Sequence, residues 1–342
     1  MGSCLHFLAA IFLLLTVCAN CQQQASAVGS SKAADSILLE ARQIADGDSP
    51  AKAEEIARGY LELHPHAAEG YFLLGYVLFR EIQVEGAQSR TDAGVPQGFL
   101  AVRDAKARAS LAEYTEGARY HTPSAFDLKI VALDYILLDD YSDADTWLSK
   151  SLAWAPEDAQ SWYYEGRIRF KEAKYKYAVA AFQQALKLNP RSVEAEDNLG
   201  LTYQAMSLMP EAAAAFKVAI EWEQTTPSND NGPWLDLGIL LTQEQRTSEA
   251  ISYLVEAVKR APADVRAHEA LAAAYRSVGR WPEARAEFEQ AVKLAPDSAS
   301  LHFQLGQAYR RTGALEQAQA EFARSSALEA RGAAPTVQPS TP

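Results

Sequence analysis

One fixed interval recurs through the second half of this sequence and restricts what the chain can fold into. The step from Gly166 to Gly200 equals the step from Phe182 to Phe216, and paired alanines, tyrosines and prolines keep the same interval. The interval matches the roughly 34-residue length of stacked helix–turn–helix units, each of which buries its apolar face against its neighbours. The sequence therefore predicts an all-α solenoid.

The clearest unit shows how each repeat is built. Trp162, Gly166 and Phe170 lie about one helical turn apart, which places them on one face of a first helix. A second helix carries Phe182 on its apolar face, and a small residue at position 166 allows the two helices to approach closely beside this ring. Pro190 marks the end of the unit, because proline cannot continue the interior of a helix.

Prolines and glycines in the same register mark the ends of the predicted helices. Pro210 and Pro282 fall where the second helix of a unit begins, a position that tolerates proline. Gly279 and Gly313 fall where the first helix ends, which favours a left-handed residue. These local signals agree with the longer period.

The pattern of an aromatic residue, Leu-Gly, Tyr, Ala, Phe, Ala and a closing Pro resembles the tetratricopeptide repeat (TPR) family, in particular its exported bacterial members. The resemblance covers residues 125–330 and implies a right-handed superhelix of helix–turn–helix repeats. Six regular units are predicted to begin near the following residues: Ala125, Ala159, Val193, Asn231, Val265 and Ala299. The interval before Asn231 is stretched by a polar segment, residues 225–230, which predicts a longer surface turn.

The pattern is weaker outside these units. Residues 36–124 are predicted to form degenerate units, interrupted near 83–97 by a polar, glycine-containing loop insertion. Residues 331–342 carry little that could be buried, and we expect them to be a disordered tail.

The start of the chain, from Met1 to Ser31, contains no Asp, Glu, Lys or Arg, and residues 5–17 are almost entirely apolar. This layout predicts a signal peptide over residues 1–27, followed by a linker over 28–35, although the segment before the apolar run lacks Lys and Arg. We therefore expect an exported protein, periplasmic or secreted. An uncleaved anchor or a lipid on Cys18, which follows Leu15 by three residues, would instead tether it to the membrane. All three cysteines lie in this segment, so we expect no disulfide framework.

The overall composition narrows the range of partners. A net charge of −12 and a pI near 5.1 argue against general nucleic-acid binding, which needs a basic surface. An acidic surface is compatible with neutral or basic protein partners. The sequence contains none of the zincin, nucleophile-elbow, P-loop or dinucleotide-binding fingerprints. It therefore predicts neither an enzyme nor a cofactor.

Two sets of side chains allow a metal-binding interpretation. His268 and His302 are separated by one repeat interval and could share a metal, but they occupy the position that Trp162 has in its own unit, which favours packing between helices. The acidic segment 139–145 superficially resembles a calcium loop but lacks its spacing. We expect it to cap a helix at a turn, and we expect no metal site.

The resemblance also implies that positions 2, 5, 9, 12 and 13 of each first helix line a concave groove. Transferred by register, the candidate partner-binding residues are Tyr163, Arg167, Phe170, Lys171, Arg276, Phe303, Gln307, Arg310 and Arg311. Aromatic rings beside guanidinium groups suit peptide recognition, whereas the alternative is that these charges only solvate a helix face. A carboxylate clamp is not predicted, because Lys129 is followed four residues later by Leu133 rather than by an asparagine.

The predicted function is therefore a protein- or peptide-binding adaptor or scaffold in the cell envelope. The alternative is a membrane-tethered assembly factor for the export of envelope components or surface polymers. In both cases the membrane is reached only through the predicted leader, residues 1–27.

Overall fold

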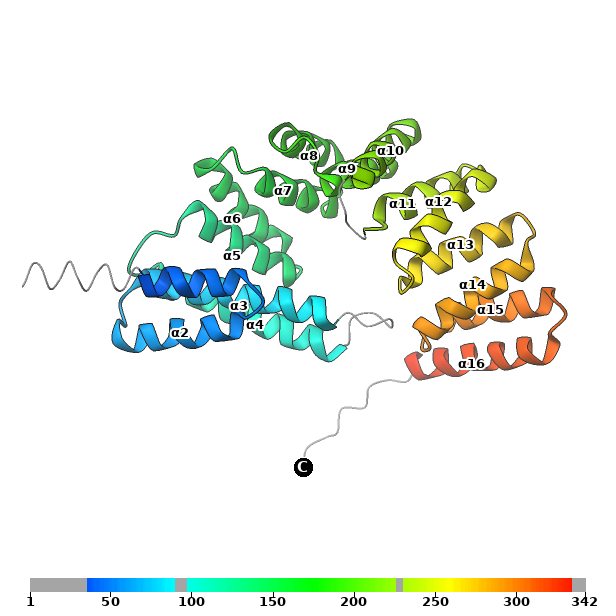
Figure 1. Cartoon of the computed structure of the whole chain (residues 1–342), viewed down its shortest axis with the longest axis horizontal. Helices are drawn as coiled ribbons and strands as arrows, with labels where there is room; N and C mark the ends of the chain where they lie inside the picture. The colour runs from blue at the N-terminus through cyan, green and yellow to red at the C-terminus, as the bar shows by residue number, and fades with distance from the viewer. Residues whose placement is uncertain (1–35, 90–96, 226–229, 334–342) are drawn as a thin grey trace, which may run out of the picture. The chain divides into compact units, whose positions relative to one another are not determined.

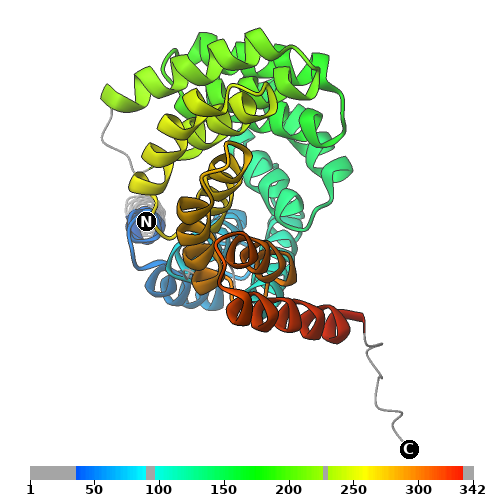
Figure 2. The ribbon, with the colours of Figure 1, turned by 90° about the vertical axis from the view of Figure 1, so that its right-hand side faces the viewer.

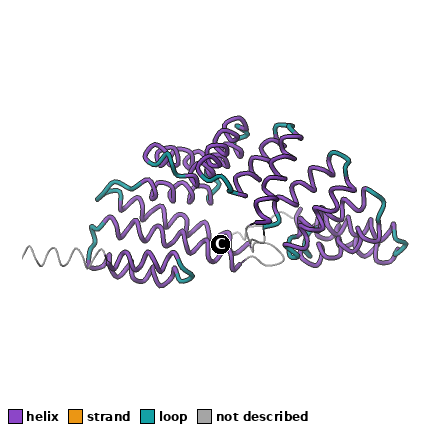
Figure 3. Tube along the Cα trace, turned by 45° about the horizontal axis from the view of Figure 1, so that its top comes forward, coloured by secondary structure: helices purple, strands orange, loops and turns teal. Residues whose placement is uncertain are grey.

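The structure is a computed structural model that describes residues 36–89, 97–225 and 230–333 (Figure 1). Helices are the only regular elements within these ranges, and turns connect most of them directly (Figure 3). The prediction of an all-α fold is confirmed. The predicted leader and linker, residues 1–35, lie outside the described residues.

The chain divides into two compact units, which we describe separately. The first comprises residues 1–85 and 102–138, and the second comprises residues 86–101 and 139–342. In the first unit, a helix over residues 36–46 precedes α2 (Pro50–Leu63), α3 (Ala68–Ser89), α4 (Gln97–Gly117) and α5 (Ala125–Leu137). The tips of α3 and α4 belong to the second unit.

Helix α3 is longer than the sequence suggested. It continues to Ser89, although a loop was expected near 83–97. Glu85 of this segment faces another helix, because it pairs with Lys106 of α4. The same lysine lies 2.9 Å from the carboxylate of Glu81, one turn earlier on α3. Residues 90–96 of the expected loop lie outside the described residues.

The first unit buries one carboxyl group completely. Ser110 Oγ lies 2.6 Å from Asp134 Oδ2 and 2.8 Å from the carbonyl oxygen of Gly75. A hydroxyl group carries one proton and can donate to only one of these acceptors, so the carboxyl group must donate the other bond. Burial raises the pKa of Asp134 well above its usual value, which agrees with a protonated side chain.

The second unit begins with α6 (Tyr141–Trp154) and continues as five helix pairs that follow one another along the chain (Figure 2). We call the first helix of each pair the A helix and the second the B helix. The A helices are α7 (Ala159–Lys171), α9 (Val193–Ala205), α11 (Gly232–Gln243), α13 (Val265–Ser277) and α15 (Ala299–Arg311). The B helices are α8 (Tyr175–Leu188), α10 (Met209–Thr225), α12 (Thr247–Arg260), α14 (Trp281–Leu294) and α16 (Leu315–Ala333).

The helix starts agree with the register of the repeat. Four of the expected starting residues are the first residues of α7, α9, α13 and α15, and Asn231 is the N-cap of α11. Ala125 is likewise the first residue of α5. At the other end, α16 continues to Ala333, inside the segment that was expected to be disordered, and residues 334–342 lie outside the described residues.

Within each pair, a small residue on the A helix faces a large apolar residue on the B helix. A Cβ added to Gly166 would lie 2.5 Å from the ring of Phe182, and one added to Gly200 would lie 2.6 Å from the ring of Phe216. Both rings are fully buried. Any side chain at these glycines would force the two helices apart, which confirms the close approach that the sequence predicted.

Every A helix in the second unit ends in a left-handed residue. Gly279 and Gly313 have φ values of 78° and 83°, as their positions predicted. The corresponding residues Ala173, Ser207 and Gln245 have φ values of 56°, 62° and 63°, without the freedom that glycine provides. The next amide group closes the cap in each case; for example, Lys174 N donates to the carbonyl oxygen of Arg169 at 2.8 Å.

The acidic residues before and within α6 act as a helix cap and as ion-pair partners. Asp140 is the N-cap of α6, and its side chain accepts a hydrogen bond from the amide of Asp143. Asp145 pairs with the half-buried guanidinium of Arg169, which also pairs with Glu165 and thereby links α6 to α7. The capping interpretation of this segment is confirmed.

Ala173→Gly and Gln245→Gly should each stabilise the protein. A left-handed conformation costs a residue with a Cβ roughly 1–2 kcal/mol, and the greater entropy of an unfolded glycine offsets roughly 0.5–1 kcal/mol of the gain. We expect a net increase of about 0.5–1 kcal/mol in the free energy of unfolding, measured by urea denaturation followed by circular dichroism. Gly279→Ala is the matched control and should destabilise the protein. A loss of stability in both glycine variants would contradict this account.

Candidate functional site

The A helices of the second unit form a continuous face. Helix α7 contacts α9, α9 contacts α11, and α11 contacts α13 directly. Gln204 of α9 donates to Gln243 of α11 at 2.9 Å, and Gln304 of α15 donates to Glu269 of α13 at 3.0 Å. We call the side of α7, α9, α11, α13 and α15 that carries positions 2, 5, 9, 12 and 13 the A-helix face. Its side chains are held on rigid elements that are spaced by the repeat.

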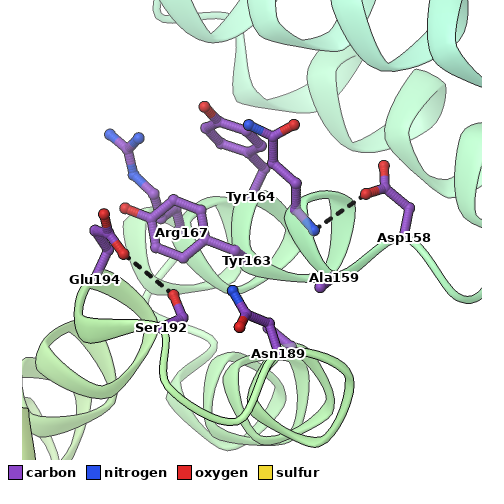
Figure 4. A pocket seen from close by; sticks show the side chains of 10 residues that line it. Asp158, Ala159, Tyr163, Tyr164, Arg167, Asn189, Ser192 and Glu194 are labelled. Atoms are coloured by element: carbon purple, nitrogen blue, oxygen red, sulfur yellow. Dashed lines mark hydrogen bonds between the residues drawn. The ribbon is translucent and has the colours of Figure 1, made fainter. Parts of the chain in front are cut away.

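The first hollow on the A-helix face lies beside α7 and the start of α9 and has a volume of about 570 Å³ (Figure 4). Tyr163, Tyr164 and Arg167 of α7 line it, together with Glu194 of α9. The Arg167 guanidinium lies 5.8 Å from the centre of each tyrosine ring, close enough for a cation–π contact. Burial raises the pKa of both tyrosines, so they present neutral hydroxyl groups at physiological pH.

A second hollow of about 380 Å³ lies between α11 and α13. Arg276 lines it, and its guanidinium donates to Gln304 at 3.1 Å. Gln304 in turn donates to Glu269, so a chain of polar contacts holds the arginine in place. The rest of the lining is Ile239, Thr242, Gln243, Arg266, Ala270 and Ala273. This hollow combines an apolar floor with oriented hydrogen-bonding groups, as peptide sites do.

The structure gathers only some of the predicted site residues. Tyr163 and Arg167 share the first hollow, and Arg276 lines the second. Phe170 packs against the apolar cluster around Phe182 and is therefore mainly a core residue.

The other predicted residues lie outside both hollows. Lys171 is exposed at the end of α7. On α15, Phe303 is 50% exposed and Gln307 is half-buried, and the exposed Arg310 and Arg311 lie near the rings of other residues. The predicted α15 contacts thus form a surface of their own.

Charges divide the A-helix face into two edges. Successive helices are antiparallel because short turns join them, so all A helices run in the same direction. Their C-terminal ends carry the basic residues Lys171, Arg276, Arg310 and Arg311, which we call the basic edge. Their N-terminal halves carry Glu194, Asp197, Asp236 and Glu269, and Asp230 lies just before α11. We call these five residues the acidic edge; the basic Arg266 lies at the same end of α13. The basic residues in the last turns complement the helix dipole.

The acidic edge was missed by the sequence prediction, which selected aromatic and basic residues. The signal was available, because Glu194, Asp197 and Glu269 occupy positions 2 and 5 of their units. What the sequence could not show is burial. Asp197 is only 9% exposed, and burial followed by the charges of Asp236 and Asp230 raises its pKa to about 8.

The histidine pair packs between helices, as the sequence predicted. His268 Nδ1 lies 2.6 Å from a carboxylate oxygen of Glu287, and Nε2 lies 3.0 Å from the carbonyl oxygen of Pro262. His302 makes the same two contacts, with Glu321 and the carbonyl oxygen of Pro296. Among the described residues, no group of three or more His, Cys, Asp or Glu side chains is arranged to hold a metal ion.

These histidines belong to a recurring contact. Trp162 Nε1 donates to the carbonyl oxygen of Pro156 at 2.8 Å. The Tyr71 hydroxyl donates to the carbonyl oxygen of Pro65 at 3.0 Å. In each case the acceptor lies six residues before the ring. A polar ring at position 4 thus ties the start of an A helix to the turn that precedes it.

His268 should make stability depend on pH. The hydrogen bond to Glu287 raises the pKa of His268 above its usual value, and both ring nitrogens face acceptors, so the folded state favours the imidazolium. This contribution is fully present below about pH 6.5, the unfolded pKa, and is lost as the pH rises through the folded pKa. His268→Gln should therefore cost more at pH 5.5 than at pH 8.5, by roughly 1–2 kcal/mol.

Urea denaturation across this pH range measures the difference. Glu287→Gln is the control. Without the carboxylate, the imidazolium of His268 loses its negatively charged partner, so the pH dependence of stability should flatten. A pH-independent cost of His268→Gln would show that the ring is neutral when the protein is folded.

The fold and the A-helix face together define a helical-repeat scaffold of the kind that binds other proteins. Three family models match parts of the sequence. One described as "TPR repeat" matches residues 274–313, and two described as "Tetratricopeptide repeat" match residues 159–192 and 299–330. The chain contains tetratricopeptide repeats. No curated protein matches its sequence.

Solved structures share this fold at low sequence identity. The type IV pilus biogenesis factor PilW is 20% identical with a TM-score of 0.54, covering 59% of this chain and 92% of its own. A chain of the APC/C hetero-tetramer Cut9–Hcn1 is 16% identical with a TM-score of 0.56, covering 82% of this chain and 50% of its own. YrrB, described as a TPR protein with an unusual peptide-binding site, is 20% identical with a TM-score of 0.44, covering 54% of this chain and 92% of its own.

No helix in the described ranges has the length and apolar character needed to cross a membrane.

Proposed function

We propose that this TPR protein is a non-enzymatic adaptor that binds a protein or peptide partner along its A-helix face. The observation that carries the proposal is the pair of hollows between neighbouring A helices, each with an arginine held beside aromatic or polar side chains. Binding on such a face needs little reorganisation, because the contact residues lie on packed helices. Arginine and tyrosine are also the residues that contribute most at protein interfaces.

The absence of catalysis is part of this proposal and rests on the sequence. The repeats account for residues 125–330, and the fingerprints of common catalytic sites do not occur in the sequence. His268 and His302, which could otherwise be considered for a shared metal, make packing contacts between helices.

A location in the cell envelope is also proposed from the sequence. The uncharged, apolar first segment supports export. The alternative, a membrane-tethered assembly factor for envelope or surface-polymer export, rests on the Leu15–Cys18 spacing in the same segment.

Reversing charges on the A-helix face should weaken partner binding. We expect Arg167→Glu, Lys171→Glu and Arg310→Glu, combined in one variant, to lower affinity at least tenfold, because like charges would replace favourable contacts. The matched control reverses three lysines on B helices, Lys187, Lys217 and Lys293, which gives the same change in net charge. Crosslinking in the native cell, followed by quantitative recovery of each partner, compares the variants.

Partners that are recovered equally with both variants would show that binding does not use the A-helix face. Circular dichroism of both variants must match that of the wild type, so that a loss of fold is not mistaken for a loss of contact.

The mature protein should begin after Ala27, and Cys18→Ala should leave its location unchanged. Mass spectrometry of the N-terminal peptide and cell fractionation measure these two outcomes. A lipid-modified N-terminus at Cys18, or release from the membrane in the Cys18→Ala protein, would favour the tethered alternative.

A further inference from the structure

One carboxyl group on the acidic edge is buried without an ion-pair partner among the described residues. Asp197 lies in the first half of α9 and is only 9% exposed. Its Oδ1 atom has no hydrogen-bond partner in the part of the chain that the structure describes. A buried, unpaired carboxylate oxygen is costly, and native proteins rarely keep one without a reason.

The neighbouring charges do not resolve this cost. Asp230 accepts a hydrogen bond from the amide of Gly232 at 2.9 Å, so it takes the positive end of α11. Asp236 has Arg266 at 3.7 Å, and this arginine side chain is 71% exposed. The charge of Arg266 also acts to lower the pKa of Asp197, but burial and the charges of Asp236 and Asp230 outweigh it.

The carboxylates converge on one place. A Cβ added to Gly232 would lie 3.2 Å from Asp230 Oδ1 and 3.4 Å from Asp197 Oδ2, so both oxygens approach the same point at the start of α11. Asp236 follows one turn into that helix. We call Asp197, Asp230 and Asp236 the acidic corner. Asp197 occupies position 5 of its unit and so lies on the A-helix face, and Asp230 and Asp236 lie beside it.

We propose that the acidic corner receives the side chain of a lysine or arginine of the bound protein or peptide. This inference rests on the proposed function of the A-helix face and names the chemistry of its partner. An ammonium or guanidinium group supplies donors without acceptors, which suits the Asp197 carboxyl group, whose Oδ2 atom faces the corner. A charge-assisted bond at a buried position is among the strongest contacts that such a face can make.

A metal ion fits the corner less well than an organic cation. The described residues contain no His, Cys, Asp and Glu group arranged to hold a metal, and the acidic corner is no exception. The raised pKa of Asp197 shows how strongly burial and its neighbours oppose its charge, and a cationic side chain from a partner would relieve both effects.

The basic edge then gives the bound segment a direction. If a cationic side chain of the partner lies at the acidic edge, its acidic side chains or carboxyl terminus face Lys171, Arg276, Arg310 and Arg311 across the A-helix face. A peptide with the opposite order of charges would meet like charges at both edges.

Selection of random twelve-residue peptides displayed on phage tests the proposal with defined probes. Peptides selected on the wild-type protein should share a lysine or arginine, and their synthetic, acetylated and amidated forms should be measured by calorimetry. Replacing that residue by norleucine or citrulline should weaken binding to the wild type at least tenfold. The same replacement should change binding to the Asp197→Asn protein less than twofold.

Asp197→Asn keeps the shape of the side chain and removes its ability to carry a negative charge beside a bound cation, so the variant should fold. Glu221→Gln, on the exposed side of α10, is the control for net charge and should behave like the wild type. Two outcomes would overturn the acidic-corner proposal while supporting partner binding on the A-helix face. In the first, peptide binding depends on Arg167 and Arg276 but on no cationic residue of the peptide. In the second, peptide binding is unchanged by Asp197→Asn. Failure to select any peptide that binds the A-helix face would overturn both proposals.

Discussion

The close approach of the two helices within each repeat is the contact on which the rest of the structure depends. At Gly166 and Gly200 the B-helix phenylalanine ring occupies the space that a Cβ would need. This contact sets the distance between helices, and the period of the sequence repeats it at the same place in each pair. Each A helix therefore presents the same positions to solvent, and neighbouring A helices align into one face.

The turns at both ends of each A helix set the direction of the chain from one helix to the next. At the end of each A helix of the second unit a left-handed residue reverses the chain, with or without glycine. At the start of α7, α13 and α15, a polar ring at position 4 lies within hydrogen-bonding distance of the carbonyl oxygen of the preceding turn, as Trp162 and His268 do. Because these contacts use backbone groups, tryptophan, tyrosine and histidine can all make them. The repeat therefore keeps its register although the ring residue at position 4 differs between units.

The helix direction also orders the charges. Basic residues in the last turns of the parallel A helices collect at one edge, where they complement the helix dipole. Acidic residues in or just before their N-terminal halves collect at the other edge. Most of the edge charges need no further explanation. Asp197 differs because burial and two neighbouring carboxyl groups outweigh the charge of Arg266, and its Oδ1 atom is buried without a hydrogen-bond partner.

The sequence alone determined the repeat, the helix starts from Ala125 onward and the packing role of His268 and His302, because periodicity and size report which residues share a helix face. It also selected Tyr163, Arg167 and Arg276, which line the two hollows of the A-helix face. Only the tertiary structure showed that α3 continues to Ser89, since its partner Lys106 is on another helix. The same holds for Asp197, whose burial and unpaired oxygen arise from contacts between repeats that no single segment encodes.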